Sequence, residues 1–298
     1  MTQSPIAALW RRYRMQIVPW LFLAPALFMF AVFVINPIIE SIAVSFYEWD
    51  GLGEKTWVGL NNYRELFDDD QFYTALKNNV IWLVLYMLAP PIGLALALFL
   101  NQTVRGIRLA KALFFFPFVI SQVVVGLVFA WFMDPSFGLL GEGFKMFGLE
   151  PVAILADERY VTYGIIIAGL WPQIAYCMIL YLTGLNSVSP SVVEAAKMDG
   201  ARSFNMLWHI ILPELRPATF IAIVVTVIGA LRSFDLVSIM TDGGPYGSSS
   251  VMAHYMYDQA IRNYRMGYGA AIATVLFVIM DVYIAFFLRR MLSKERGR

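Results

Sequence analysis

Six long apolar runs constrain the fold of this sequence more than any other feature. They cover residues 17–39, 79–100, 112–133, 161–183, 218–240 and 267–288, and each is 22 or 23 residues long. A helix of about 20 residues crosses the roughly 30 Å hydrocarbon core of a bilayer. Strands of a membrane barrel need about ten residues of alternating polarity, whereas these runs are continuously apolar. The sequence therefore predicts an all-α membrane protein with six transmembrane helices.

The composition agrees with a membrane location. Hydrophobic residues make up 59% of the chain and charged residues 14%, whereas soluble domains have about half and a quarter. The single cysteine, Cys177, lies within the fourth apolar run and excludes a disulfide framework within the chain. We expect it to be a small buried apolar filler. No nucleic-acid partner is expected.

The distribution of positive charge predicts the orientation in the membrane. Fourteen Lys and Arg residues fall on the side of both termini, seven fall on the opposite side, and Arg232 lies within an apolar run. Because Lys and Arg in short loops are retained in the cytosol, both termini are expected there. The predicted cytosolic parts are an N-terminal segment at 1–16, a loop at 185–217 and a basic tail at 289–298.

The opposite face carries three larger loops, at 40–78, 134–160 and 241–266. They hold fifteen of the twenty-one acidic residues. An acidic outer rim could meet a basic partner, or its charges could simply be solvated loop residues.

The cytosolic loop has its own helix signals. Ser189 and Pro190 are typical of an N-cap followed by proline at the first helical position. Gly200 can adopt the left-handed conformation that ends a helix. The resulting helix has about ten residues, or roughly 15 Å, and is too short to cross a bilayer. A second helical stretch is predicted at 203–212, ending before Pro213.

Two such short helices need something to pack against, because isolated helices of this length are marginal in water. One possibility is a protein partner on the cytosolic side. The other is an amphipathic linker resting on the membrane interface, which Trp208 and its apolar neighbours would support. The spacing alone leaves both open.

The run EAAKMDGARSFNMLWHIILP resembles the cytoplasmic EAA loop of permease subunits of binding-protein-dependent ABC importers. The pattern is Glu-Ala-Ala, three residues, Gly, nine residues, Ile, one residue and Leu-Pro. The matching positions are Glu194, Ala195, Ala196, Gly200, Ile210, Leu212 and Pro213. The runs GLNNYRELFDDDQF, RLAKALFFFPFVISQVVVGLVFAWF and TDGGPYGSSSVMAHYMYDQAIRNYRMGYGAAIA resemble the sugar-type branch, in particular its maltose- and glycerol-phosphate-type first permease subunit. The resemblance thus covers nearly the whole chain, which would form one transmembrane permease domain over residues 1–298.

This resemblance implies a role and a set of partners. In the family, the helix that carries Glu194 to Asp199 docks into a cleft of an ATP-binding subunit, and nucleotide-driven closure of two such subunits moves the loops together. Glu194 and Asp199 would make charged contacts, Ala195 and Ala196 would pack closely, and Gly200 would form the turn. The expected assembly is a multi-pass complex in the cell (inner) membrane with a second permease subunit of different sequence, two ATP-binding subunits and an extracytoplasmic solute-binding protein. Its expected substrate is a carbohydrate or related glycoside.

The sequence lacks the motifs that would let this chain bind a nucleotide or catalyse hydrolysis by itself. It has no GxxxxGK[ST] phosphate loop, HExxH or GxSxG. His209 and His254 fall on opposite sides of the membrane in the predicted topology, so neither suggests a metal site. We therefore expect a transport subunit that is not an enzyme and binds no cofactor, with ATP and Mg²⁺ held by the partner ATPase subunits.

Polar and small residues recur on one face of each of two apolar runs. Gln173 and Tyr176 follow Pro172 on one face of the fourth run, and Thr226 and Ser233 share a face of the fifth. Such faces are often simple helix contacts. Because the maltose-type relatives bind sugar between the corresponding helices, the resemblance favours a pathway lined by Trp171, Gln173, Tyr176, Thr226 and Ser233.

Two other classes of membrane protein would show different sequence features. A secondary transporter of small polar solutes would work without an ATPase and typically shows inverted repeats and coupling-ion ligands on broken helices. A membrane glycosyltransferase or hydrolase would need a pair of catalytic acids at a membrane face. The sequence shows neither an evident inverted repeat nor such a pair.

Overall fold

The computed structural model describes residues 5–102 and 104–295. Residues 1–4 of the predicted N-terminal segment and 296–298 of the predicted basic tail lie outside the described residues. The first half of the chain contains α1 (Pro5–Phe30), the π-helix η1 (Ala31–Ile35), α2 (Asn36–Val44), β1 (Tyr47–Glu48), β2 (Thr56–Trp57), α3 (Asn61–Phe67), α4 (Asp70–Tyr86), α5 (Ala89–Leu100), α6 (Ile107–Val119), α7 (Gln122–Phe132) and α8 (Leu139–Met146). β1 and β2 form a small antiparallel hairpin.

The second half is also helical. It contains the 3₁₀-helix η2 (Ile154–Ala156), α9 (Val161–Asn186), α10 (Pro190–Met198), α11 (Ser203–Met206), the π-helix η3 (Leu207–Ile211), α12 (Leu212–Glu214), α13 (Arg216–Leu231), α14 (Phe234–Met240), α15 (Met252–Tyr257), the π-helix η4 (Asp258–Arg262) and α16 (Met266–Glu295). The prediction of an all-α membrane part is confirmed.

Four helical stretches are long and apolar enough to cross a membrane. They are Val18–Val44, Asp70–Leu100, Val161–Asn186 and Met266–Phe286. Two further apolar pairs are strongly bent, Ile107–Val119 with Gln122–Phe132 at 99° and Phe204–Glu214 with Arg216–Leu231 at 71°. Length and composition within the described residues thus give four candidate spans, or up to six if each bent pair counts as one.

The length of the apolar run 112–133 predicted one continuous helix, but the run is divided between two helices. Ile120 is extended, with φ −77° and ψ 140°, and separates α6 from α7. Pro117 weakens the end of α6 because its ring nitrogen carries no hydrogen to donate. Ser121 then starts a new helix, since its Oγ accepts a hydrogen bond from the amide of Val124 at 3.4 Å.

The predicted helix at 218–240 is also broken. α13 ends at Leu231, and Arg232 and Ser233 connect it to α14. The hydroxyl of Ser233 donates toward the carbonyl oxygens of Gly229 at 3.1 Å and Ala230 at 2.7 Å. These bonds satisfy acceptors that the end of α13 leaves free.

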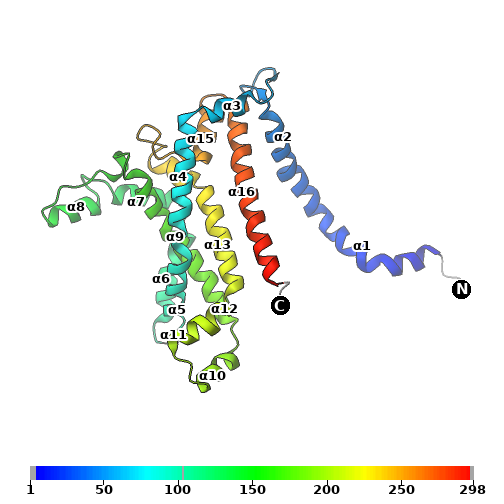
Figure 1. Cartoon of the computed structure of the whole chain (residues 1–298), viewed down its shortest axis with the longest axis vertical. Coiled ribbons are helices and arrows are strands. Elements are labelled where there is room, and N and C mark those ends of the chain that lie inside the picture. Colours follow the sequence, from blue (N-terminus) through cyan, green and yellow to red (C-terminus); the bar gives the residue numbers. More distant parts are fainter. Residues whose placement is uncertain (1–4, 103, 296–298) are drawn as a thin grey trace.

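α9 lies at the centre of the bundle, where it packs against α4, α5, α6, α7, α13 and α14 (Figure 1). Close helix contacts depend on glycines. A Cβ on Gly93 of α5 would lie 2.6 Å from the Cβ of Cys177, and a Cβ on Gly169 of α9 would lie 2.1 Å from the Oη of Tyr86. Cys177 is fully buried, as expected of an apolar filler.

The N-terminal helices have a different environment. α1, η1 and α2 extend away from the bundle (Figure 1), and no residue in the most apolar window of Val18–Val44 is buried. α2 contacts α16. α16 runs from the end of the molecule where α3 lies toward the end where α10 to α12 lie (Figure 1).

Candidate functional site

The predicted coupling loop, residues 185–217, contains α10, and this helix ends at a glycine. Ser189 is extended before Pro190, as the sequence predicts, although its Oγ contacts Ser191 Oγ at 2.8 Å and does not cap the helix. At the other end, Gly200 has φ +80°. Its amide donates to Lys197 O at 3.1 Å. The predicted left-handed glycine is confirmed.

This ending is a Schellman motif. The amide of Ala201 donates to the carbonyl of Ala196 at 2.9 Å, which is the second bond of the motif. A Cβ on Gly200 would meet no atom within 4 Å. The requirement for glycine therefore comes from the left-handed backbone and not from crowding.

α10 presents most of its motif residues to the outside. Glu194, Ala195 and Asp199 are exposed, whereas Ala196 is 8% exposed and packs inward. Among the described residues, neither Glu194 nor Asp199 forms an ion pair or a side-chain hydrogen bond within the chain. Both carboxylates can thus meet another molecule without breaking an existing contact.

The second part of the coupling loop forms one continuous helical stretch of α11, η3 and α12. It runs to Glu214, so the predicted end before Pro213 is wrong. The amide of Leu212 bonds to Leu207 O, five residues back, in a π turn. A proline normally clashes with the carbonyl four residues before it, and a wider π turn accommodates the ring.

The apolar residues of this stretch divide between inside and outside. Ile210, Leu212 and Pro213 are partly buried. Phe204 and Trp208 are 70% and 55% exposed, and their rings lie 6.0 Å apart. Two neighbouring exposed aromatic rings beside a helix with exposed charged residues form an amphipathic surface suited to a protein partner or a membrane interface.

The structure brings two of the five predicted pathway residues together. Gln173 Nε2 on α9 donates to Thr226 Oγ1 on α13 at 2.8 Å. Cys177 Sγ lies 3.5 Å from the same hydroxyl. Thr226 is fully buried. This pair is a polar contact between two apolar helices near the middle of α9.

The other predicted pathway residues on α9 face different neighbours. Tyr176 stacks on Phe118 of α6, with ring centroids 4.9 Å apart and planes 15° apart. Trp171 contacts Phe129 of α7 at 5.7 Å. Ser233 lies at the break after α13, so the expected helical face shared with Thr226 does not form. The described contacts therefore do not join all five residues.

Sequence reasoning missed polar residues on α4 that lie beside this contact. Tyr86 approaches Gly169, and its ring lies 4.9 Å from that of Trp82. Trp82 is fully buried, and its Nε1 has no hydrogen-bond partner within the part of the chain that the structure describes. Asn79 accepts from the amide of Met252 at 2.8 Å and so links α4 to α15. An asparagine at the start of an apolar run was the available signal.

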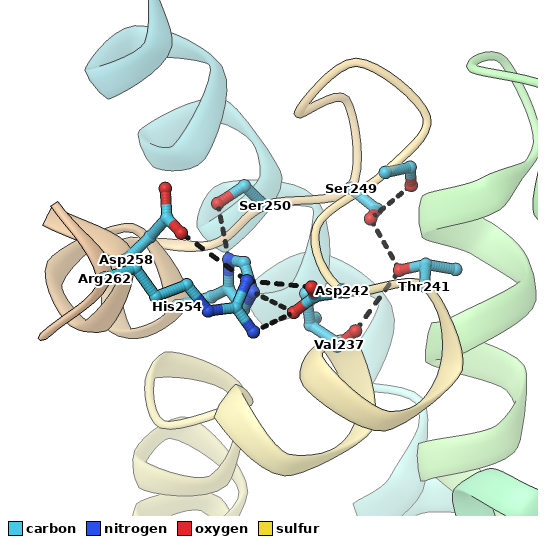
Figure 2. A network of polar contacts seen from close by, with 9 residues as sticks. Val237, Thr241, Asp242, Ser249, Ser250, His254, Asp258 and Arg262 are labelled. Carbon is cyan, nitrogen blue, oxygen red and sulfur yellow. Dashed lines mark hydrogen bonds and ion pairs between the residues drawn. The ribbon is translucent and has the colours of Figure 1, made fainter.

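At the opposite end of the bundle, polar residues tie the loop 241–266 to itself, as Figure 2 shows. Arg262 donates to both carboxylate oxygens of Asp242, at 2.8 and 2.7 Å. His254 Nε2 lies 3.3 Å from Asp242 Oδ1, and Ser250 Oγ lies 3.2 Å from His254 Nδ1. The hydrogen bond from Arg262 holds the pKa of Asp242 below its ordinary value.

A second group of bonds ties this loop to α3, to the start of α4 and to α16. The hydroxyls of Tyr255 and Tyr268 both donate to Asp69 Oδ2, at 2.6 Å for Tyr268. Burial disfavours ionisation of Asp69, but these hydrogen bonds outweigh it and lower its pKa. Arg265 bonds both carboxylate oxygens of Glu65 at 2.6 Å. We call residues 241–268, with Glu65 and Asp69, the polar cap.

These features define a class of protein: a multi-span membrane protein with a short exposed helical loop at one end and an internally bonded polar cap at the other. Comparison with known proteins gives the family. Residues 89–297 match the family described as the binding-protein-dependent transport system inner membrane component, and the chain belongs to it. The family predicted from the sequence is confirmed.

Individual relatives agree. The chain is 36% identical over 270 residues to the probable ABC transporter permease protein YurN of Bacillus subtilis, covering 89% of this chain and 92% of the relative. It is 32% identical over 265 residues to the multiple sugar-binding transport system permease protein MsmF of Streptococcus mutans, covering 88% and 91%. These relatives are permease proteins, so the chain has a transport role.

A solved structure shares the fold. A bacterial ABC transporter involved in the import of the acidic polysaccharide alginate contains a chain that matches with a TM-score of 0.82 and 23% identity. The match covers 95% of this chain and 98% of that chain. At this identity, the likeness establishes the permease fold of the present chain.

Proposed function

We propose that this chain is a permease subunit that forms part of the translocation pathway of an ATP-driven importer for a carbohydrate or related glycoside. The observation that carries the proposal is the coupling loop, an exposed helix with unpaired acids that ends at a left-handed glycine. Relatives named for sugar transport support the substrate class.

The proposed topology has six spans with both termini and the coupling loop in the cytosol. Two of the six proposed spans are the bent helix pairs. The fourteen Lys and Arg residues on that side support the orientation, as does the course of α16 toward the end that carries α10 (Figure 1). The polar cap then faces the outside, where a solute-binding protein would deliver the substrate.

The coupling loop would be the part of the chain that the ATP-binding subunits contact and move. In the proposed complex, Glu194 and Asp199 contact a cleft on an ATP-binding subunit, Ala195 and Ala196 allow close approach, and Gly200 sets the turn. Ile210, Leu212 and Pro213 would hold the loop to the membrane helices, because they are partly buried. ATP and Mg²⁺ would be held by two such partner subunits, and a second permease subunit would complete the pathway.

The substrate would pass beside the polar contact between α9 and α13. Gln173 and Thr226 offer hydrogen-bonding groups there, and the break at Ser233 gives α13 and α14 a point at which to move relative to each other. Trp171 and Tyr176 would contribute aromatic faces in the outward-open arrangement. Uncharged sugars are bound by such groups without strong charges.

The test is co-purification of an ATPase subunit from the native host in mild detergent. We expect the wild-type chain to co-purify with an ATP-binding subunit. The charge reversal Glu194→Lys in the coupling loop should reduce that recovery at least tenfold. The reason is that a lysine at this position would repel a cationic group that the carboxylate attracts in the desolvated interface.

The matched control is Glu150→Lys, which makes the same change at an exposed position on the opposite face. It should leave recovery unchanged. Absence of any ATPase subunit from the wild-type preparation would contradict the proposal, and would favour the secondary-transporter alternative. Equal recovery with Glu194→Lys would remove Glu194 from the coupling site.

A further inference from the structure

An open groove lies between α6 and α9, apart from the polar contact of Gln173 and Thr226 between α9 and α13. Its volume is about 270 Å³. It is lined by Lys111, Ala112, Phe115, Met178, Ile179 and Leu182. The groove is therefore apolar along its length, with a single cation among its lining residues.

The two helices are held together beside the groove. The Phe118–Tyr176 stack, with centroids 4.9 Å apart, lies one to two turns deeper along α6. Phe115 continues this row of rings, 5.8 Å from Phe118. Because α6 packs on α9 at these rings, the groove follows the contact between the two helices.

Positive charge gathers where α6 begins. Arg105 precedes the helix, and Arg108 and Lys111 are three residues apart within its first two turns. In the part of the chain that the structure describes, none of these three cations forms an ion pair. Three unpaired cations within seven residues leave a strong local field that an anion would neutralise.

This charge is unfavourable for α6 itself. A helix N-terminus carries a partial positive charge, so cations in the first turns are repelled by it. Gly106 occupies the N-cap and offers no side-chain hydrogen bond to the first amides. Both facts make the start of α6 complementary to a negatively charged group.

The cations lie at one end of the groove and apolar side chains line the rest, as the headgroup and the acyl chains of a lipid would require. α6 begins at the end of the molecule where α11 and α12 lie (Figure 1), which is the cytosolic side in the proposed topology. A cationic side chain there can extend toward the headgroup layer while its stem covers apolar surface. The apolar lining continues from Lys111 toward the centre of the membrane.

From this arrangement we propose that the groove is a binding site for an anionic phospholipid. One acyl chain lies along Ala112, Phe115 and Leu182, and the phosphate contacts Lys111 with Arg108 beside it. Basic pockets between transmembrane helices on the cytosolic side are recognised as headgroup sites. The proposal uses the proposed orientation but not the proposed substrate or the ATPase contact.

The test counts bound lipid on the full chain with its associated subunits by native mass spectrometry. The probes are palmitoyl-oleoyl phosphatidylglycerol and, as the zwitterionic control, palmitoyl-oleoyl phosphatidylcholine. We expect wild-type protein to retain phosphatidylglycerol in preference to phosphatidylcholine. Lys111→Gln should weaken the retention of phosphatidylglycerol about fivefold, and Arg108→Gln with Lys111→Gln more than tenfold.

Two further variants separate charge from shape. Ala112→Trp places a large ring in the groove at an exposed position without changing the charge, and it should also lower retention. Arg289→Gln removes an exposed cation on the same side of the protein but outside the groove, and it should leave retention unchanged.

Equal retention of both lipids by wild-type protein would overturn the proposal. So would unchanged retention in both the double variant and Ala112→Trp. If Lys111→Gln instead released the second permease subunit while phosphatidylglycerol stayed bound, the groove would be a protein interface, and the lipid proposal would be wrong. These outcomes do not depend on whether Glu194 couples to an ATPase.

Discussion

The coupling loop and the polar cap lie at opposite ends of one helical bundle and are built in opposite ways. In the cap, Arg262 and His254 both bond Asp242 (Figure 2), and Asp69 accepts hydrogen bonds from two tyrosines. In the coupling loop, the acids are exposed and unpaired within the described chain.

The difference indicates where each region finds its stabilising contacts. A loop whose carboxylates and aromatic rings point outward gains from a partner, because no internal contact must be broken first. A cap whose charged groups are satisfied internally resists local opening. We therefore interpret the cap as a rigid frame and the coupling loop as the part to which force is applied.

Each region has a glycine with φ near +80°, and comparing them gives the largest expected effect. Gly243 has φ +78°, and a Cβ there would lie 2.7 Å from the His254 ring. Gly243→Val combines backbone strain with a clash, so we expect the cap to be destabilised by roughly 2–4 kcal/mol. Hydrogen exchange over 241–266 in detergent would measure the loss of protection. Protection equal to that of wild-type protein would contradict a rigid cap.

A smaller effect is expected from a single bond of the cap. Tyr268→Phe removes a hydroxyl that donates to a carboxylate at 2.6 Å, and such bonds contribute about 1.5–3 kcal/mol. We expect faster exchange at the starts of α4 and α16. Tyr73→Phe is the control, because its hydroxyl donates to an exposed backbone carbonyl. If both variants exchanged alike, the Asp69 cluster would not be what joins these helices.

In the coupling loop, Gly200→Val should cost about 1 kcal/mol of local strain, because a Cβ there meets nothing and the penalty is the backbone alone. We expect lower recovery of the ATPase subunit with unchanged protection of the cap. Gly106→Val is a matched control, since Gly106 has φ +85° and equally open surroundings. If both variants lost recovery of the ATPase subunit, the effect would come from backbone strain in general and would not be specific to the coupling loop.

The smallest effect concerns pH. The pKa of Asp242 is lowered in the folded cap, so its contribution to stability is present above the ordinary value of 3.8 and is lost as pH falls through the lower folded value. We expect the wild-type cap to be cleaved by pepsin more slowly than Asp242→Asn at about pH 5, and this difference to shrink as pH falls below 3.8. A difference that had already vanished at about pH 5 would contradict the pairing with Arg262.

The sequence predicted the parts of the fold that depend on local chemistry. Continuous apolar runs marked the membrane helices, and Gly200 marked the turn of the coupling loop. The breaks at Ile120 and Ser233 were missed, because a serine in an apolar run does not reveal whether its hydroxyl caps a helix end or bonds within the helix.

The candidate pathway was predictable only in part for a similar reason. Gln173 and Thr226 meet because two helices pack at a particular rotation, and helical spacing alone does not fix that rotation. Tyr86 and Trp82, whose Nε1 has no hydrogen-bond partner among the described residues, escaped notice because aromatic residues in an apolar run are ordinarily packing residues.

In the proposed mechanism, this chain does not drive transport by itself, and its conformational changes are driven by the ATPase subunits. The most direct test reconstitutes it into vesicles, alone and with its co-purified subunits, and follows uptake of labelled sugars supplied with the binding protein. We expect accumulation against a gradient only in vesicles that contain the ATPase subunits and are loaded with ATP. Accumulation by the chain alone would contradict this expectation.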